Sequence, residues 1–252
     1  LGRVGQIQMV QANLRYPESV EAALRRSLAD QPTATLNSQW EWLGHQTDAE
    51  GVTARLATPE GERSIRARYL VGADGARSPV RKAEGIDFVD LNFEEPWLVV
   101  DVLVDDAERL PIANLQICNP ERPTTCVLMG EGRHRWEFMI KPGETAEQVS
   151  DDAFIARLLE PWNVSGAVRI ERKAVYTFRA RIASQWRKGR VLLAGDAAHQ
   201  TPPFAGQGMC SGLRDAANLA WKLAAVLRDE AADSLLDSYQ PERAPNLRAT
   251  ID

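Results

Sequence analysis

Two glycine-rich segments contain the residues whose types and spacing are best suited to chemistry. The first, residues 69–81 (YLVGADGARSPVR), is an apolar run followed by two glycines that flank Asp74. Glycine lets the backbone approach a ligand closely, and an aspartate at the end of a strand can accept hydrogen bonds from a hydroxylated ligand. The segment predicts either a ligand contact at Asp74 and Gly75 or a plain strand–turn–helix junction with Ser78 as the N-cap.

The second segment, residues 190–223, combines more of these features. A short apolar run leads into Gly195 and Asp196, and a loop with two prolines and three glycines precedes a long helical pattern. A glycine-rich loop that opens a helix directs free N–H groups and the positive helix end toward electron-rich ligand atoms. Asp196 is positioned to bind a ribose or ribityl hydroxyl. The coincidence of these features favours a ligand site over a loop shaped only by packing.

Hydrophobic patterns predict the elements that position the first segment. A helix is expected at residues 19–29, and strands are expected at 38–44, 52–58 and 62–72. The apolar run at 69–71 is typical of a strand buried on both faces. Asp74 and Gly75 would therefore directly follow a core strand.

The region between the two segments has a different texture. From about residue 92 to residue 184, strand-like runs predominate, with one short helix near 151–160. This pattern predicts a mostly antiparallel sheet inserted between two α/β pieces. A strong helix is then expected at about 208–229. Its apolar residues are expected on one face, namely Leu213, Ala216, Ala217, Ala220, Leu223, Ala224 and Leu227.

Composition narrows the class of protein. In 252 residues, 30 Lys and Arg stand against 35 Asp and Glu, interspersed along the chain, so neither a nucleic-acid surface nor a polybasic membrane anchor is expected. No apolar run approaches the length of about 18 residues that a membrane span needs. Three cysteines without C-x-x-C spacing indicate neither a disulfide framework nor a metal site, and a cytoplasmic location fits best.

The two segments together resemble the flavoprotein aromatic hydroxylases, also called class A FAD monooxygenases. The shared patterns are G-A-D-G-x-x-S-x-V-R at 72–81 and G-D-A-A-H-x-x-P-P-x-x-G-Q-G at 195–208, in particular as found in 3-(3-hydroxyphenyl)propionate and phenol hydroxylases. Three further segments agree with this branch, at residues 135–144, 218–223 and 235–243.

The resemblance implies an α/β fold, α+β overall. A Rossmann-like FAD-binding domain, at 1–90 and 186–252, would enclose a mostly antiparallel substrate-binding sheet at 91–185. The family's first G-x-G-x-x-G is missing, so the FAD domain would be truncated and would lack its first βαβ unit. Relatives often have His-Gln-Pro where this chain has residues 15–17 (RYP), which places the flavin contact there in doubt.

The resemblance also implies roles for individual residues. Asp196, following Gly195, would bind the ribityl chain, while Asp74 and Gly75 would lie near the pyrophosphate and ribose. The isoalloxazine would contact the backbone of the second loop, at Gly206, Gln207, Gly208 and Met209. The candidates for catalytic contact near the ring are Pro202, Pro203 and His199.

The implied reaction is hydroxylation of a phenol. NAD(P)H would reduce the FAD, O2 would add to give the C4a-hydroperoxide, and a small aromatic substrate would be hydroxylated. A homodimer is the assembly considered. The alternatives are a related flavin epoxidase, halogenase or antibiotic hydroxylase, or a non-catalytic fragment that does not bind flavin.

Several residues have two interpretations. Trp136 and Phe138 alternate along one strand and would contact either the substrate or the core, with the core favoured for Phe138. His199 would either face the flavin or, more in keeping with its type, form a structural hydrogen bond. Glu242 and Arg243 are interpreted as a solvated ion pair.

Overall fold

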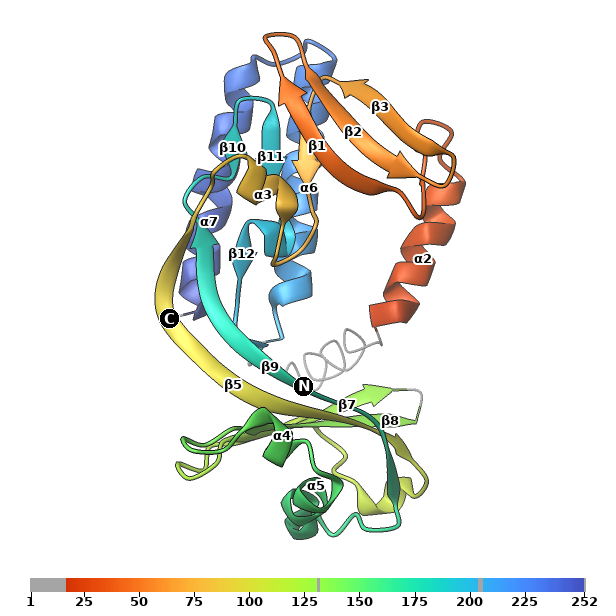
Figure 1. The fold of residues 1–252 in the computed structure, drawn as a ribbon, viewed down its shortest axis with the longest axis vertical. Coiled ribbons are helices and arrows are strands. Elements are labelled where there is room, and N and C mark those ends of the chain that lie inside the picture. Colours follow the sequence, from red (N-terminus) through yellow and green to blue (C-terminus); the bar gives the residue numbers. More distant parts are fainter. Residues whose placement is uncertain (1–16, 131, 204–205, 252) are drawn as a thin grey trace, which may run out of the picture. The chain divides into compact units, whose positions relative to one another are not determined.

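The computed structural model describes residues 17–130, 132–203 and 206–251 (Figure 1). The chain divides into two compact units. Unit 1 contains Glu95–Thr177 together with the segment that precedes Asn37, and unit 2 contains Asn37–Glu94 and Phe178–Asp252. Unit 2 combines strands with the longer helices α6 (Gly208–Leu227) and α7 (Tyr239–Ile251), while an antiparallel sheet dominates unit 1. The predicted α/β fold class is confirmed.

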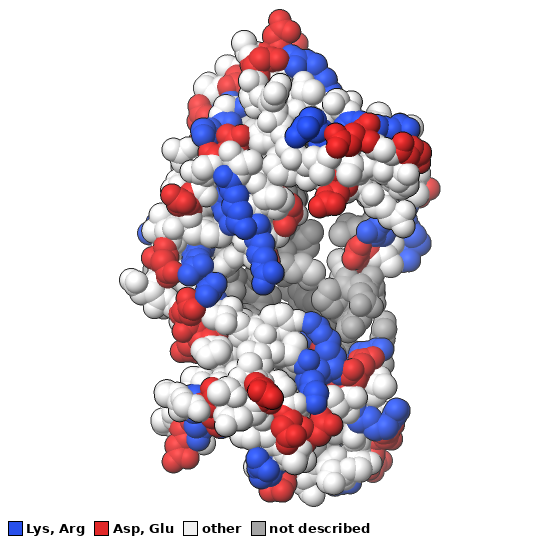
Figure 2. All heavy atoms as spheres, in the orientation of Figure 1, with Lys and Arg blue, Asp and Glu red and all other residues white. Residues whose placement is uncertain are grey.

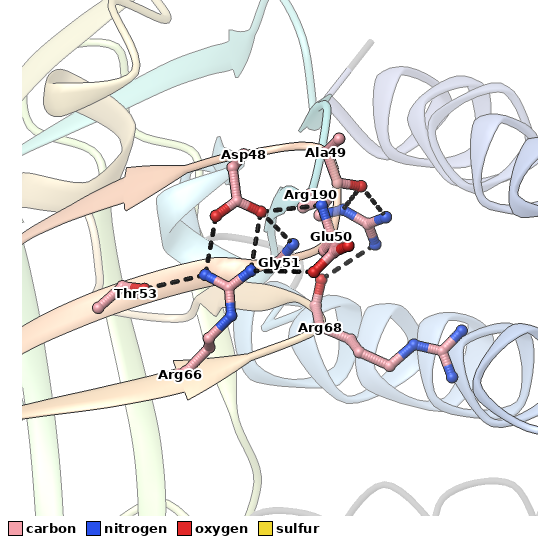
Figure 3. A network of polar contacts seen from close by, with 8 residues as sticks. All are labelled: Asp48, Ala49, Glu50, Gly51, Thr53, Arg66, Arg68 and Arg190. Carbon is pink, nitrogen blue, oxygen red and sulfur yellow. Dashed lines mark hydrogen bonds and ion pairs between the residues drawn. The ribbon is translucent and has the colours of Figure 1, made fainter.

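Unit 2 begins with an antiparallel meander of three strands. Its strands are β1 (Glu41–Thr47), β2 (Val52–Thr58) and β3 (Gly61–Ala67). Arg66 donates to both carboxylate oxygens of Asp48 at 2.8 Å in the turn between β1 and β2 (Figure 3). The Nε of Arg190 donates to the carbonyl of Ala49 at 3.1 Å, which connects this meander to the second sheet of the unit.

The second sheet of unit 2 contains strands from both of the chain segments that form the unit. Its order is β10 (Arg187–Lys188), β11 (Val191–Leu193) and β4 (Leu70–Gly72). β11 pairs with β4 in parallel and with β10 in antiparallel orientation. The helices of the unit are α3 (Pro79–Ala83), α6 (Gly208–Leu227) and α7 (Tyr239–Ile251).

The core of unit 2 lies around β11. Val191, Leu192 and Leu193 are at most 1% exposed and pack with Trp186 and Tyr239. The prediction that the run at 69–71 is buried on both faces is wrong, because Val71 is 38% exposed. β4 has β11 as its one neighbour in the sheet as described.

Unit 1 is built on a sheet that includes two long strands. β5 (Phe88–Val104) and β9 (Val168–Ala183) run side by side and contribute residues to both units (Figure 1). The remaining strands within unit 1 are β6 (Leu115–Ile117), β7 (Thr124–Gly130) and β8 (Arg133–Met139), and the order of the sheet continues β5-β8-β7-β6. The described pairings β5–β8, β7–β8 and β6–β7 are antiparallel, as the sequence predicts.

Short helices contribute to the core of unit 1, and their starts follow from capping residues. Thr145 forms a capping box with Gln148 at α4 (Ala146–Val149), and Asp151 accepts two backbone N–H bonds at α5 (Asp152–Leu159). Val149 and Ile155 from these helices are fully buried in the same hydrophobic cluster as the strands. The first helix among the described residues, α2, spans Pro17–Ala29.

The surface carries both signs of charge. Lys and Arg are interspersed with Asp and Glu on the face shown in Figure 2. Many charged side chains of the described residues pair with one another, such as Arg181 with Asp90 at 3.0 Å and Arg169 with Asp105 at 2.8 Å. Among the helices described, none is long and apolar enough to cross a membrane.

Candidate functional site

The two glycine-rich segments lie next to each other in unit 2. β4 and β11 pair in register, with Gly72 opposite Leu193, and the pairing ends with a hydrogen bond of 3.0 Å from Ala194 N to the Gly72 carbonyl. Because parallel strands share their carboxyl edge, the turns that follow both strands lie at the same edge of the sheet. The sequence places them far apart, and the sheet brings them together.

The turn that follows β4 caps helix α3 and also exposes a carboxylate and a stretch of backbone. Ser78 is the N-cap of α3, since its Oγ accepts from Arg81 N at 2.9 Å. Asp74 is exposed, and one of its oxygens accepts from Val80 N at 3.0 Å. Gly75 has φ +81°, and a Cβ built there would meet nothing within 4 Å. The capping interpretation is therefore confirmed for Ser78, while Asp74 retains an exposed carboxylate beside an open backbone.

Arg81 joins the two turns, and its role was not predicted from the sequence. Its guanidinium, in a residue only 5% exposed, donates to the carbonyls of Ala76 at 3.3 Å and Ala197 at 3.1 Å. It also lies 3.8 Å from the centroid of the Phe88 ring. Burial lowers the pKa of Arg81, and the charge of Asp74 partly offsets this, yet a guanidinium stays protonated.

The second turn exposes its aspartate. Gly195 has φ +60°, a conformation that favours glycine, and it begins the 3-10 turn η3 (Gly195–Ala197). Asp196 is exposed, and its carboxylate has no hydrogen bond or ion pair among the described residues. A Cβ on Gly212 of α6 would lie 3.4 Å from Gly195 Cα, so the turn and the helix approach closely. This carboxylate is available to a ligand.

The loop before α6 has open backbone at two of its glycines. Gly206 has φ +62° with nothing within 4 Å of a built Cβ, and Gly208 would meet only Thr201 Oγ1, at 3.7 Å. Met209 is 44% exposed. Gln207 accepts from Arg214 at 3.0 Å, and Pro202 and Pro203 are half-buried.

The amino end of α6 completes the site. Its first N–H groups lack acceptors within the helix, and its dipole adds positive potential there. Next to Asp196 and the open glycines, the arrangement offers carboxylate oxygens that can accept from ligand hydroxyls and amide groups that can donate to a ligand. No group of His, Cys, Asp or Glu suited to a metal ion occurs among the residues described.

His199 has a structural position. It lies on β12 (His199–Gln200), is 1% exposed, and its Nε2 is 2.5 Å from Asp215 Oδ2. Its ring packs against Trp186 with centroids 5.3 Å apart. Of the two interpretations of His199, the geometry matches the structural hydrogen bond.

Trp136 and Phe138 lie in unit 1, in its core. They are 0% and 2% exposed and lie on the same face of β8. Both belong to the hydrophobic cluster that includes Val149 and Ile155. Phe138 also borders a surface cavity together with Trp162. The opposite face of β8 presents charged residues, where Arg135 Nε donates to Asp101 at 2.6 Å. Of the two interpretations, both side chains match the core.

Comparison with known protein families identifies the chain's relatives. A model of the FAD binding domain family matches residues 10–252. The chain is 46% identical over 207 residues to a 3-(3-hydroxy-phenyl)propionate/3-hydroxycinnamic acid hydroxylase of Mycolicibacterium smegmatis, covering 81% of this chain and 36% of that protein. A protein of the same name from Comamonas testosteroni is 44% identical over 217 residues, covering 83% and 36%. The chain thus spans less than half the length of these relatives.

Solved structures of a hydroxylase and a monooxygenase also resemble the chain. The chain resembles aklavinone-11 hydroxylase in a ternary complex with FAD and aklavinone, with TM-score 0.77, 33% identity, and coverage of 84% of this chain and 42% of that one. It also resembles p-nitrophenol 4-monooxygenase from Pseudomonas putida, with TM-score 0.77, 27% identity, and coverage of 90% and 58%.

Proposed function

Because the chain belongs to the FAD-binding domain family of the flavoprotein aromatic hydroxylases, we propose that it is the FAD- and substrate-binding part of an NAD(P)H-dependent monooxygenase that hydroxylates a phenolic compound. The observation that carries the proposal is the meeting of two glycine-rich turns at the carboxyl edge of β4 and β11. At this edge Asp196 exposes a carboxylate without a described partner. Hydroxyl groups of a ribityl chain match such an acceptor.

The residues present fit FAD in their chemistry. Asp196 would accept ribityl hydroxyls, and Asp74 and Gly75 would approach the ribose and pyrophosphate. The open backbone at Gly206 and Gly208 leaves room for a flat ring, because a Cβ at Gly206 meets nothing within 4 Å and one at Gly208 meets nothing closer than 3.7 Å. The N–H groups at the start of α6 would donate to the electron-rich edge of that ring.

The chain's contribution to the reaction is position and environment. Bound FAD supplies the redox chemistry and the activation of O2, with NAD(P)H as the electron donor. The polar turns of unit 2 would fix the ring, and pocket walls would orient the phenol and exclude water. We assign substrate choice to the inserted sheet region, residues 91–185, because the cofactor's reactivity is common to the family while the walls set the orientation of the substrate.

Binding of FAD tests the cofactor assignment. Replacing Asp196→Ala removes a charge-assisted hydrogen bond of about 1.5–3 kcal/mol, so the Kd for FAD should rise about 10- to 150-fold in a titration followed by flavin fluorescence. Asp87→Ala is the matched control, since Asp87 is an exposed aspartate of the same unit outside both turns. Equal Kd values for Asp196→Ala and the wild type would remove Asp196 from the site.

Turnover tests the reaction. The whole protein should consume NAD(P)H faster when 3-(3-hydroxyphenyl)propionate is added, and a dihydroxylated product should form with uptake of O2. A polycyclic phenol is the comparison substrate, because aklavinone-11 hydroxylase is among the structural relatives. A protein that binds FAD yet hydroxylates neither would favour a flavin epoxidase or halogenase. A protein that binds no FAD would be a non-catalytic member of the family.

A further inference from the structure

The buried face of α6 includes polar and charged residues, and one of them is an aspartate. The residues of α6 that are buried are Ser211, Asp215, Leu219, Lys222 and Val226. Asp215 is 0% exposed, although a carboxylate buried without partners is strongly unfavourable. Its retention in the core therefore requires specific donors.

Three elements supply those donors. Asp215 Oδ2 accepts from Gly195 N at 3.1 Å and lies 2.5 Å from His199 Nε2, and Oδ1 accepts from Arg243 Nε at 2.8 Å. Burial raises the pKa of Asp215, but the hydrogen bonds from His199, Arg243 and Gly195 outweigh this effect and leave the pKa below its usual value. The carboxylate is therefore ionised at neutral pH.

The bond to Gly195 links this buried charge to the candidate flavin site. Gly195 is the residue before Asp196 and adopts φ +60° in the turn. Its Cα lies 3.4 Å from the Cβ position of Gly212, one turn of α6 before Asp215. The backbone that carries Asp196 is therefore held against α6, the helix that begins directly after the glycine-rich loop.

We propose that Asp215 is a positioning residue for the flavin. It fixes the turn that carries Asp196 against α6 before the cofactor arrives, so that binding does not have to order this turn. Asp215 acts through Asp196 and does not touch the cofactor. This inference rests on the proposed function.

Asp215→Asn tests the inference, because the substitution keeps the size of the side chain and removes its charge. The Kd for FAD should rise about tenfold or more, and the visible absorption bands of the bound flavin should shift. The double variant Asp196→Ala, Asp215→Asn should bind FAD about as weakly as Asp196→Ala alone, since one residue acts through the other.

Lys222→Met is the matched control. Lys222 is also fully buried on this face of α6, but its Nζ contacts Ser238 at 2.6 Å and Glu242 at 2.8 Å, away from Gly195. This variant should melt at a lower temperature yet bind FAD with the wild-type Kd. If Lys222→Met weakens FAD binding as much as Asp215→Asn does, the effect is general destabilisation and the inference fails. Additive effects in the double variant would also overturn it.

Amide hydrogen exchange on the flavin-free wild type gives a test that needs no variant. The Gly195 amide should be protected by its bond to the buried carboxylate before FAD is added. Exchange at the unprotected rate would show that the turn is not ordered in advance. Wild-type protein that binds no FAD while the Gly195 amide is protected would refute the proposed function, whereas FAD binding with an unprotected amide would refute this inference alone.

Discussion

A buried thiol–imidazole pair makes the stability of unit 1 depend on pH. His134 is 1% exposed, and its Nε2 lies 2.9 Å from the Sγ of Cys126, which is 0% exposed. The His134 ring also packs against Trp136 with centroids 4.8 Å apart. Burial lowers the pKa of His134 to about 4 and raises the pKa of Cys126 to about 12, so both groups are neutral at pH 7.

The sign of the effect follows from the two states of His134. In the unfolded chain the imidazole takes up a proton as the pH falls through about 6.5, while the folded protein resists protonation down to a pH of about 4. Falling pH therefore favours the unfolded state throughout this window. Since one pKa unit corresponds to about 1.4 kcal/mol, going from pH 7 to pH 5 should remove about 2 kcal/mol of stability through His134.

The assay is urea unfolding at pH 7, 6 and 5. His134→Phe keeps a planar ring against Trp136 and removes the titration, so its free energy of unfolding should fall by about 2 kcal/mol less than that of the wild type over this range. Cys126→Ser is the control, because desolvation of the ring, and not the thiol, lowers the pKa, and this variant should keep the wild-type pH dependence. An identical pH dependence for His134→Phe and the wild type would refute the reasoning.

Three further substitutions separate packing from ligand contact. Gly72→Ala should cost about 1–3 kcal/mol of stability, measured by urea unfolding, because its Cβ would lie 3.0 Å from Val80 Cβ; an unchanged midpoint would contradict this. Gly208→Val should leave the melting temperature of the flavin-free protein nearly unchanged while weakening FAD binding, and wild-type affinity would show that the flavin does not pass there. Trp136→Ala should cost about 3–5 kcal/mol of stability as a core truncation, and a smaller loss would suit a residue at a pocket wall.

Strand positions and the two motifs could be predicted from the sequence because both depend on local patterns. β2 has the predicted bounds of 52–58, and α5 (Asp152–Leu159) lies within the predicted 151–160. Ser78 was also recognisable as a cap from the proline and helical pattern that follow it. In these places hydrophobic alternation and side-chain capping determine the structure without help from distant residues.

The orientation of α6 could not be predicted in this way. The apolar face of this helix is not its buried face: Leu213 is 46% and Leu227 is 42% exposed, while Asp215 and Lys222 are fully buried. An amphipathic pattern assigns charged residues to solvent, but these two have partners on segments distant in sequence. The only signal in the sequence was that Asp215 and Lys222 are charged, and the partners of these charges lie far along the chain.

The solvated ion pair expected at Glu242 and Arg243 is wrong for the same reason. Arg243 is 7% exposed and bonds Asp215, while Glu242 accepts from Lys222 at 2.8 Å. The two residues are neighbours in sequence but belong to separate pairs with α6. Arg243 offsets the charge of Asp215, and Glu242 offsets the charge of Lys222. The amphipathic pattern of α6 would have placed both of these helix residues in solvent.

Glycine in these motifs has two roles that sequence alone cannot separate. At Gly72 and Gly212 the absence of a Cβ permits internal contact, since built Cβ atoms would lie 3.0 Å from Val80 and 3.4 Å from Gly195. At Gly75 and Gly206, by contrast, nothing lies within 4 Å and φ is positive. Glycines of the first kind join strand, turn and helix into one rigid frame, and those of the second kind leave its surface open. A cofactor site needs both kinds of glycine, because exposed backbone selects a ligand only where the elements that support it are held in place.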